Sequence, residues 1–307
     1  MDSLKPTICA EGLGFPEGPV WCSNGDMLLV DIHGGNIIRV NPDGATNIIA
    51  HCGGGPNGLA VGPDAKLYVC NNGGFEWIER RGRWFPGAIA EDYKSGSIQR
   101  VDPSSGAVET LYTHCSGRQL RGPNDLIFDK NGGFWFTDLG KTCGRTRDLG
   151  ALYYARPDGE HIVEVGFPLD GPNGIAIAPD ESRLFIAETY SGRVFYWDLD
   201  GPGEVRRNTR TVHGGHYFAT VTSGLALDSM AVDNSGCLCI AAPGHGGGIV
   251  IFRTDGTQSL IETGDAMTTN ICFGGPNLRT AFITLSLSGR LVSVPWETTG
   301  HQLAFNL

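Results

Sequence analysis

The feature that most constrains the fold is a phrase that returns six times along the chain. Each copy contains a polar residue, an apolar run, a turn with Asp or Gly, and a second apolar run. A unit this short cannot bury its apolar faces alone, so the repeat indicates an architecture in which similar units pack side by side. The copies are FPEGPVWCSNGDMLLVD, GGPNGLAVGPDAKLYVC, RGPNDLIFDKNGGFWFTD, DGPNGIAIAPDESRLFIAE, ALDSMAVDNSGCLCIAA and TTNICFGGPNLRTAFIT.

Each copy holds two strand-like runs, and most copies are followed by a third run and often by a fourth, as in GGNIIRVNPDG and TNIIAHC. Short runs of β-branched and aromatic residues bounded by Gly, Pro, Asn and Asp indicate strands. Six units of four strands predict an all-β fold, a six-bladed β-propeller with four-stranded blades. We expect the strand-like N-terminal stretch 5–13 to close the ring by completing the last blade beside residues 302–305.

Length and charge narrow the class further. The chain has 307 residues, 40% of them hydrophobic, and no Pro/Ser-rich or charged linker divides it, so we expect a single propeller domain over residues 1–307. A net charge of −10 argues against binding to nucleic acid or to an anionic membrane. Whether the protein is a monomer or a homodimer stays open.

The chain start and the cysteines predict a cytoplasmic location. The start MDSLKPTICAEG lacks the basic and apolar regions of a signal peptide, and the chain has no apolar stretch of bilayer-spanning length. Nine cysteines, an odd number without CxxC pairs, are expected to be reduced thiols.

The residue before the first apolar run carries a side-chain oxygen in every copy. In a propeller the first strand of each blade lines the central channel, so these residues are predicted to form a ring around the axis. Carboxylate and amide oxygens are ligands that Ca²⁺ prefers, although Mg²⁺, Mn²⁺, Zn²⁺ and Fe²⁺ also accept such donors. The six residues are Glu17, Asn57, Asn124, Asn173, Asp228 and Asn270.

A simpler interpretation treats each Pro-Asn-Gly as a β-turn, in which Asn and Gly are favoured for their backbone conformations alone. Turn chemistry does not explain why Glu17 and Asp228 occupy the same position in other copies.

The segments EGPVW, RGPNDLIFD, GPNGIAIAPD with FIAET, and LDSMAVDNSG resemble the SMP-30/gluconolactonase/luciferin-regenerating-enzyme superfamily of six-bladed propellers. The resemblance runs over nearly the whole chain and implies a calcium-dependent lactonase acting on a small lactone. It implies that Glu17, Asn124, Asn173 and Asp228 are the metal ligands. The family's PDGM appears here as LDSM, so Asp228 keeps its place while its neighbours change.

The same resemblance implies that Arg121 binds the lactone. Asn57 and Asn270 lie in the ring outside the four implied ligands, so they are expected to contact the substrate or to support the ligands. His245, in the turn PGHGGG, is a further candidate for contacting the substrate and a second candidate base.

The ring suggests a mechanism in which a divalent cation polarises the carbonyl of the substrate as a Lewis acid. Asp228 is the expected general base, since its second oxygen can face the cavity. A carboxylate beside a cation is a weaker base than a free one, and desolvation would partly restore its basicity. Two alternatives stay open: a phosphotriester hydrolase in which Asp228 attacks phosphorus, and a calcium-binding propeller without turnover.

Two insertions are expected to shape the substrate entrance. The longer one, residues 71–95, is rich in aromatic residues that either roof the channel or cover a blade from outside. The shorter one, residues 140–148, carries Lys141, Arg145 and Arg147, cations that would suit an anionic lactone.

Overall fold

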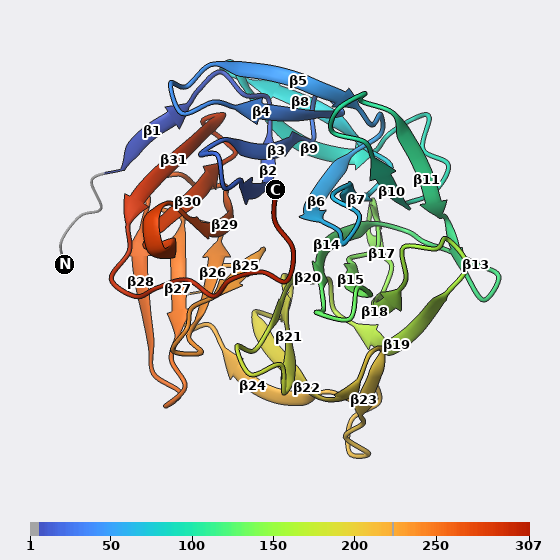
Figure 1. Ribbon diagram of the computed structural model, residues 1–307. Coiled ribbons are helices and arrows are strands. Elements are labelled where there is room, and N and C mark those ends of the chain that lie inside the picture. The colour runs from blue at the N-terminus through green and yellow to red at the C-terminus, as the bar shows by residue number, and fades with distance from the viewer. Residues whose placement is uncertain (1–5, 223) are drawn as a thin grey trace.

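The computed structural model describes residues 6–222 and 224–307. Six small antiparallel sheets stand around a central axis, as Figure 1 shows, and the predicted six-bladed β-propeller is confirmed. The innermost strands contact one another all the way round in the order β2, β6, β14, β20, β25 and β29. The first apolar run of each sequence repeat therefore lies in a strand beside the axis.

The strands of each blade are given from the axis outward. Blade 1 has β2 (Pro16–Trp21), β3 (Met27–Asp31), β4 (Asn36–Val40) and β5 (Thr46–His51). Blade 2 has β6 (Pro56–Val61), β7 (Leu67–Asn71), β10 (Ser97–Val101) and β11 (Val108–Tyr112). Blade 3 has β14 (Pro123–Phe128), β15 (Phe134–Asp138), β18 (Gly150–Ala155) and β19 (Ile162–Leu169).

Blade 4 has β20 (Pro172–Ile177), β21 (Arg183–Glu188), β22 (Arg193–Gly201) and, both paired with β22, β23 (Glu204–Arg206) and β24 (His216–Thr220). Blade 5 has β25 (Met230–Val232), β26 (Leu238–Ala242), β27 (Gly248–Phe252) and β28 (Gln258–Glu262). Blade 6 has β29 (Thr268–Gly274), β30 (Thr280–Leu285), β31 (Arg290–Pro295) and β1 (Thr7–Ala10).

Three short hairpins and one 3₁₀ turn extend the blades: β8 (Phe75–Arg80) with β9 (Arg83–Ile89), β12 (His114–Cys115) with β13 (Arg118–Gln119), β16 (Thr142–Cys143) with β17 (Thr146–Arg147), and η1 (Pro276–Leu278).

The second strand of each blade is mostly apolar because both of its faces are buried. In β3, Leu28 and Val30 pack against blade 2, whereas Met27 and Leu29 pack against blade 6. Alternate residues of a strand point to opposite faces, so each blade contributes to two interfaces. The buried apolar residues accordingly form six clusters, one between each pair of neighbouring blades.

A buried polar residue ends the second strand in four blades and holds the loop that enters the blade. The Asp31 carboxylate accepts a hydrogen bond from the Phe15 N–H (2.8 Å), and Asp138 accepts bonds from the N–H groups of Arg121 (2.7 Å) and Gly122 (2.6 Å). Asn71 and Glu188 do the same in blades 2 and 4. These bonds satisfy buried backbone donors at the end of the channel where the inner strands begin.

Closure of the ring differs from the prediction in its partner strand. The N-terminal strand β1 does complete the last blade, but it pairs with β31, and Thr7 lies opposite Ser293. Of the stretch 5–13, Lys5 lies outside the described residues. Residues 302–305 form no strand and instead run to the centre of the molecule, where Figure 1 marks the C-terminus.

This C-terminal segment, residues 296–307, crosses the end of the channel where the inner strands finish. The N–H of His301 donates to the Val232 carbonyl (3.0 Å), and the Ser23 N–H donates to the Leu307 carbonyl (2.7 Å). Phe305 packs among the core residues of blades 1, 2 and 3, with its ring 5.8 Å from that of Phe128. The segment therefore joins the last blade to the first three.

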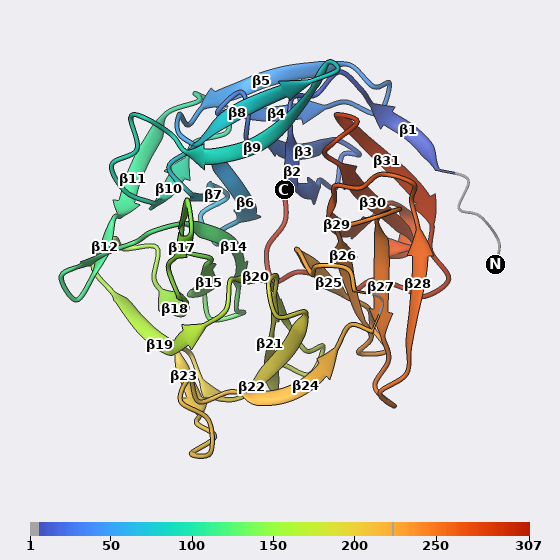
Figure 2. The same cartoon turned by 180° about the vertical axis from the view of Figure 1, so that it is seen from behind.

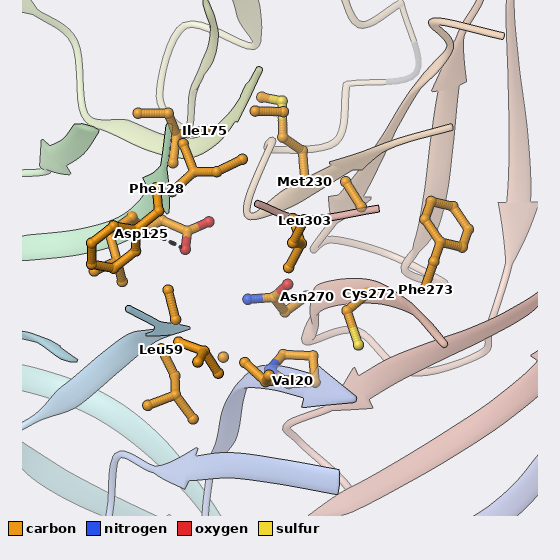
Figure 3. A pocket seen from close by; sticks show the side chains of 18 of the residues that line it. Val20, Leu59, Asp125, Phe128, Ile175, Met230, Asn270, Cys272, Phe273 and Leu303 are labelled. Atoms are coloured by element: carbon orange, nitrogen blue, oxygen red, sulfur yellow. Dashed lines mark hydrogen bonds between the residues drawn. The ribbon is translucent and has the colours of Figure 1, made fainter. Parts of the chain in front are cut away.

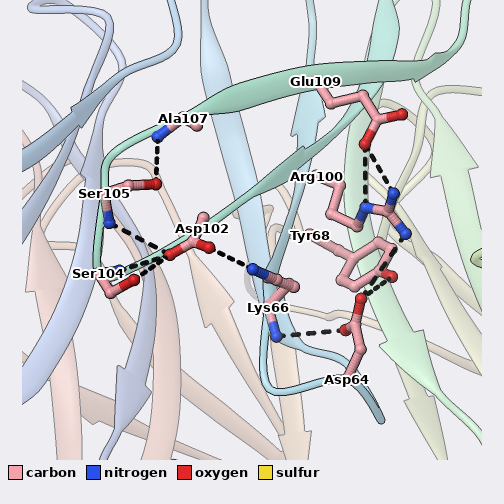
Figure 4. A network of polar contacts seen from close by, with 9 residues as sticks. All are labelled: Asp64, Lys66, Tyr68, Arg100, Asp102, Ser104, Ser105, Ala107 and Glu109. Atoms are coloured by element: carbon pink, nitrogen blue, oxygen red, sulfur yellow. Dashed lines mark hydrogen bonds and ion pairs between the residues drawn. The ribbon is translucent and has the colours of Figure 1, made fainter.

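Polar contacts tie together the loops of blade 2 at that same end (Figure 4). Lys66, in the turn after β6, pairs with Asp102, in the turn after β10. Arg100 binds Glu109 on the outer strand at 2.7 Å, and the Tyr68 hydroxyl donates to Asp64 at 3.1 Å. These contacts lie far along the strands from the ring, so they serve the blade rather than the candidate site.

All nine cysteines are free thiols, as predicted. Within residues 6–222 and 224–307 there is no helix of the length and apolar character needed to cross a bilayer.

Replacing Phe305 with Ala should lower the free energy of unfolding by about 1 to 3 kcal/mol, because the partly buried ring would be lost from the two cores between blades 1, 2 and 3. Urea unfolding measures the difference, with exposed Gln302→Ala as the matched control. Equal midpoints for Phe305→Ala and wild type would show that the segment does not hold the blades.

Candidate metal centre

The six predicted ring residues all lie at the start of the blades on the channel side. Five of them are in the inner strands β2, β6, β14, β20 and β29, and Asp228 lies just before β25, with its N–H bonded to the Ala241 carbonyl at 2.8 Å. The pairing register shifts at this point in each of those five strands. Such bulges redirect side chains, and here they lie beside the channel axis.

Glycine follows the ring residue in three blades because neighbouring blades approach closely there. A Cβ atom on Gly18 would lie 2.6 Å from the Asn57 carbonyl oxygen, and one on Gly58 would lie 2.6 Å from that of Asn124. A Cβ on Gly174 would lie 2.4 Å from the Asp228 carbonyl oxygen. The Pro-Asn-Gly segments are thus parts of inner strands, and the β-turn interpretation is wrong.

Glu17 is 3% exposed, and its carboxylate is held by two donors. The N–H of Gly18 and the Nδ2 of Asn270 each donate to Glu17 Oε2 at 2.7 Å. Asn270 Oδ1 accepts from the Ile271 N–H at 2.8 Å, so both ends of this amide are engaged. Asn270 therefore supports Glu17 in this structure, which is one of the two roles expected for it. Asn57 is buried in β6 next to it.

Asn124 and Asn173 are 7% and 4% exposed, yet their carbonyl oxygens have no hydrogen-bond partner. Only five buried side-chain polar atoms in the described part of the chain lack a partner, and these two oxygens are among them. A buried carbonyl without a donor is costly, so these positions call for a cation or another donor.

Three carboxyl groups near the axis lack a compensating cation among the described side chains. Burial raises the pKa of Asp228 well above its usual value, and the charges of Glu17 and Asp125 raise it further. Burial also raises the pKa of Glu17. Asp228 is the most accessible ring member, since the other five ring residues are all buried.

Asp125 is a functional candidate that the sequence analysis missed. Burial and the Glu17 charge raise its pKa to about 8, and its carboxylate accepts from the Leu126 N–H at 3.0 Å. It occupies the position that is Gly18, Gly58 or Gly174 in other blades. The replacement of Gly by Asp in RGPNDLIFD was the available signal.

Beyond the ring, the channel widens into a cavity of about 100 Å³ that is closed by the C-terminal segment. Figure 3 shows Asp125 and Asn270 pointing into this space from opposite sides, among apolar neighbours such as Leu59, Met230 and Leu303. Its size is enough for a few water molecules. It lies on the side of the ring away from the loops that would receive a substrate.

Arg121 lies on the loop that enters blade 3 and is partly exposed. Its Nε donates to Asp148 at 2.8 Å, and its guanidinium lies 5.5 Å from the Tyr93 ring centroid. The hydrogen bond to Asp148 is the main reason that the pKa of Arg121 is raised. A paired and stacked guanidinium keeps its remaining N–H groups in a fixed direction, as ligand binding requires.

The other predicted contact, His245, is exposed in the loop between β26 and β27, which lies at the same end as the ring. The structure does not bring it into contact with any of the ring side chains that it describes.

The two insertions lie at that end of the molecule, in blades 2 and 3. Trp77 packs on Phe15 (5.3 Å between centroids), and Trp84 stacks on His33 (4.2 Å), so the β8–β9 hairpin covers blade 1 rather than the channel, as seen in Figure 2. Of the predicted cations, Lys141 is buried against blade 2, with its Nζ 3.0 Å from the Gly74 carbonyl oxygen. Burial lowers the Lys141 pKa to about 7.

Comparison with known proteins agrees with this arrangement. The family described as SMP-30/Gluconolactonase/LRE-like region matches residues 15–286. The chain belongs to this family. A gluconolactonase from Zymomonas mobilis is 30% identical over 95% of this chain and 82% of its own length. Lactonase drp35 from Staphylococcus aureus is 28% identical over 86% of this chain and 74% of its own length.

The fold is also similar to that of solved structures. Regucalcin from Agrobacterium tumefaciens, a calcium-binding protein, superposes with a TM-score of 0.77 over 99% of this chain and 98% of its own, at 16% identity. At that identity the similarity establishes the shared propeller fold.

The donor set of the ring fits a hard divalent cation. The carboxylates of Glu17 and Asp228 would balance its charge. The amide oxygens of Asn124 and Asn173 have no partner among the described residues and could serve as further ligands. In the described ranges 6–222 and 224–307, no group of three His, Cys, Asp or Glu side chains is arranged to hold a metal.

The raised carboxyl pKa values predict how metal-free protein responds to pH. The folded state keeps protons that unfolded Asp and Glu release near pH 4, so this contribution to stability is full below about pH 4 and is lost as pH rises toward 8. Glu17→Gln removes one titrating group and its repulsion. Between pH 5 and 8, the free energy of unfolding of this variant should fall by about 1 to 3 kcal/mol less than that of wild type.

Urea unfolding in the presence of a chelator at both pH values measures this difference. Exposed Glu297 provides the control, since Glu297→Gln should follow wild type. An identical pH dependence for Glu17→Gln and wild type would refute the claim that the pKa of Glu17 is raised in the metal-free protein.

Proposed function

We propose that the protein hydrolyses a small lactone and that one divalent cation, preferably Ca²⁺, is held by Glu17, Asn124, Asn173 and Asp228. The observation that carries the proposal is the pair of buried Asn carbonyl oxygens that have no partner among the described residues, on the same ring as the carboxylates of Glu17 and Asp228. The activity named for the Zymomonas mobilis and Staphylococcus aureus relatives supports lactone hydrolysis.

Calcium is preferred for two reasons. The four donors are all hard oxygens, which suit Ca²⁺ better than the softer transition metals. The propeller of regucalcin, described as a calcium-binding protein, has the same fold.

When bound, a divalent cation would supply Lewis-acid polarisation of the lactone carbonyl. Asp228 accepts a proton from the attacking water, because it is the ring carboxylate that is not fully buried. Asn270 and the Gly18 N–H keep Glu17 fixed, so Glu17 does not compete for that proton. Arg121 directs its free N–H groups toward the ester or hydroxyl oxygens of the substrate.

The first test measures proton release from γ- and δ-lactones by chelated protein and after each divalent metal is restored. Activity should vanish with chelator and return with Ca²⁺. Asp228→Asn should lower kcat by about 10² to 10⁴-fold, the range expected for loss of a general base. Asp43→Asn, at an exposed turn, is the control and should match wild type.

The alternatives give different results in the same assay. Turnover of phosphotriesters but of no lactone would favour the phosphotriester hydrolase. Calcium binding without turnover of either substrate class would favour a propeller that only binds its partner, and would overturn the proposed activity.

Arg121→Met should raise KM about ten- to a hundredfold with little change in kcat, because it removes a substrate contact outside the metal ligands. Steady-state kinetics and calorimetric Ca²⁺ titration together test this role. A lowered Ca²⁺ affinity with unchanged KM would contradict it. Arg156→Met, at the other end of blade 3, is the matched control.

A further inference from the structure

The side chain of Thr189 lies beside the proposed metal ligand of blade 4. Asn173 Nδ2 donates to Thr189 Oγ1 at 3.1 Å, while Asn173 Oδ1 is buried without a partner. An amide has a donor end and an acceptor end, and its orientation is fixed by what each end meets. The Thr189 hydroxyl accepts from the donor end of this amide, and in that orientation the oxygen is left without a partner among the described residues.

This hydrogen bond engages the donor end of the amide, which leaves the oxygen free. Asn124 has the same unpartnered oxygen, but its side chain makes no hydrogen bond to the described residues.

The hydroxyl of Thr189 is not required by the architecture of the blade. Residues 32, 72, 139 and 189 each follow the last residue of a second strand, and their N–H groups donate to the carbonyls of Phe15, Gly55, Gly122 and Gly171 at 2.8 to 3.0 Å. Blades 1 and 3 place Ile32 and Leu139 at this position. An apolar residue is therefore compatible with the fold here, and the hydroxyl occurs where it can reach a ring residue.

We propose that Thr189 is a positioning residue that presents Asn173 Oδ1 to the cation, an inference that rests on the proposed metal site. It acts through Asn173 and does not contact the metal or the substrate. Partners that orient a ligand in this way commonly contribute ten- to a hundredfold to metal affinity.

The test titrates Ca²⁺ calorimetrically into chelator-treated, desalted full-length protein. Thr189→Val keeps the shape and removes the hydroxyl, and should weaken Ca²⁺ binding about tenfold or more. Thr189→Ser keeps the hydroxyl and should remain within about threefold of wild type. Metal-free stability should be equal for wild type and Thr189→Val, as Ile32 and Leu139 indicate.

Asn173→Asp separates orientation from general support. A carboxylate presents an oxygen whichever way it turns, so Thr189→Val in that background should change Ca²⁺ affinity less than about threefold. An equal loss in both backgrounds would show a structural role and overturn the inference, and so would unchanged affinity in Thr189→Val alone. If wild type itself binds no Ca²⁺, the proposed metal site fails instead.

Should Thr189→Val not fold, the serine variant compared with Thr189→Ala decides between the two roles. Retained affinity in Ser with loss in Ala supports the inference, and equal affinity in both refutes it.

Discussion

The centre of this molecule depends on one constraint, which is that the carboxyl groups of Glu17, Asp125 and Asp228 are held close together near one axis. Like charges in a site of low polarity raise one another's pKa, and burial raises these further. Either bound protons or a cation must compensate the negative charges of these carboxylates. A cation would also satisfy the oxygens of Asn124 and Asn173, which have no partner among the described residues.

The repeat makes such a centre possible without a dedicated binding loop. Each blade delivers one residue to the axis, and glycines such as Gly58 allow neighbouring inner strands to approach within contact of each other's backbone. Cores between blades hold this geometry, because the second strands pack on both faces. The same rigid scaffold leaves the loops at the ring end free to vary, and blades 2 and 3 carry their insertions there.

The repeat in the sequence predicted the fold and the ring positions, because a period in apolar and turn residues directly reports a repeated packing unit. It could not predict the partner of β1, since strands of similar apolar character differ only in where the ring closes. The course of residues 302–305 across the channel was likewise not encoded in a periodic pattern.

Within the site, alignment of the copies identified Asn173 but not Thr189, whose relation to the amide is made by folding across 16 positions. In the sequence, Asp125 stands where other copies have glycine. Only the structure shows that neighbouring blades approach closely at this position, so that a side chain here lies beside the axis. Lys141 appeared available to a substrate in the sequence, whereas packing against blade 2 buries its ammonium group.

The central claim is that one divalent cation occupies the ring. The most direct measurement is anomalous diffraction from crystals grown with Mn²⁺ as a substitute for Ca²⁺. The account predicts one strong peak on the axis, bounded by Glu17, Asn124, Asn173 and Asp228. A ring without a peak, with Asn124 and Asn173 bonded instead to ordered water, would contradict it.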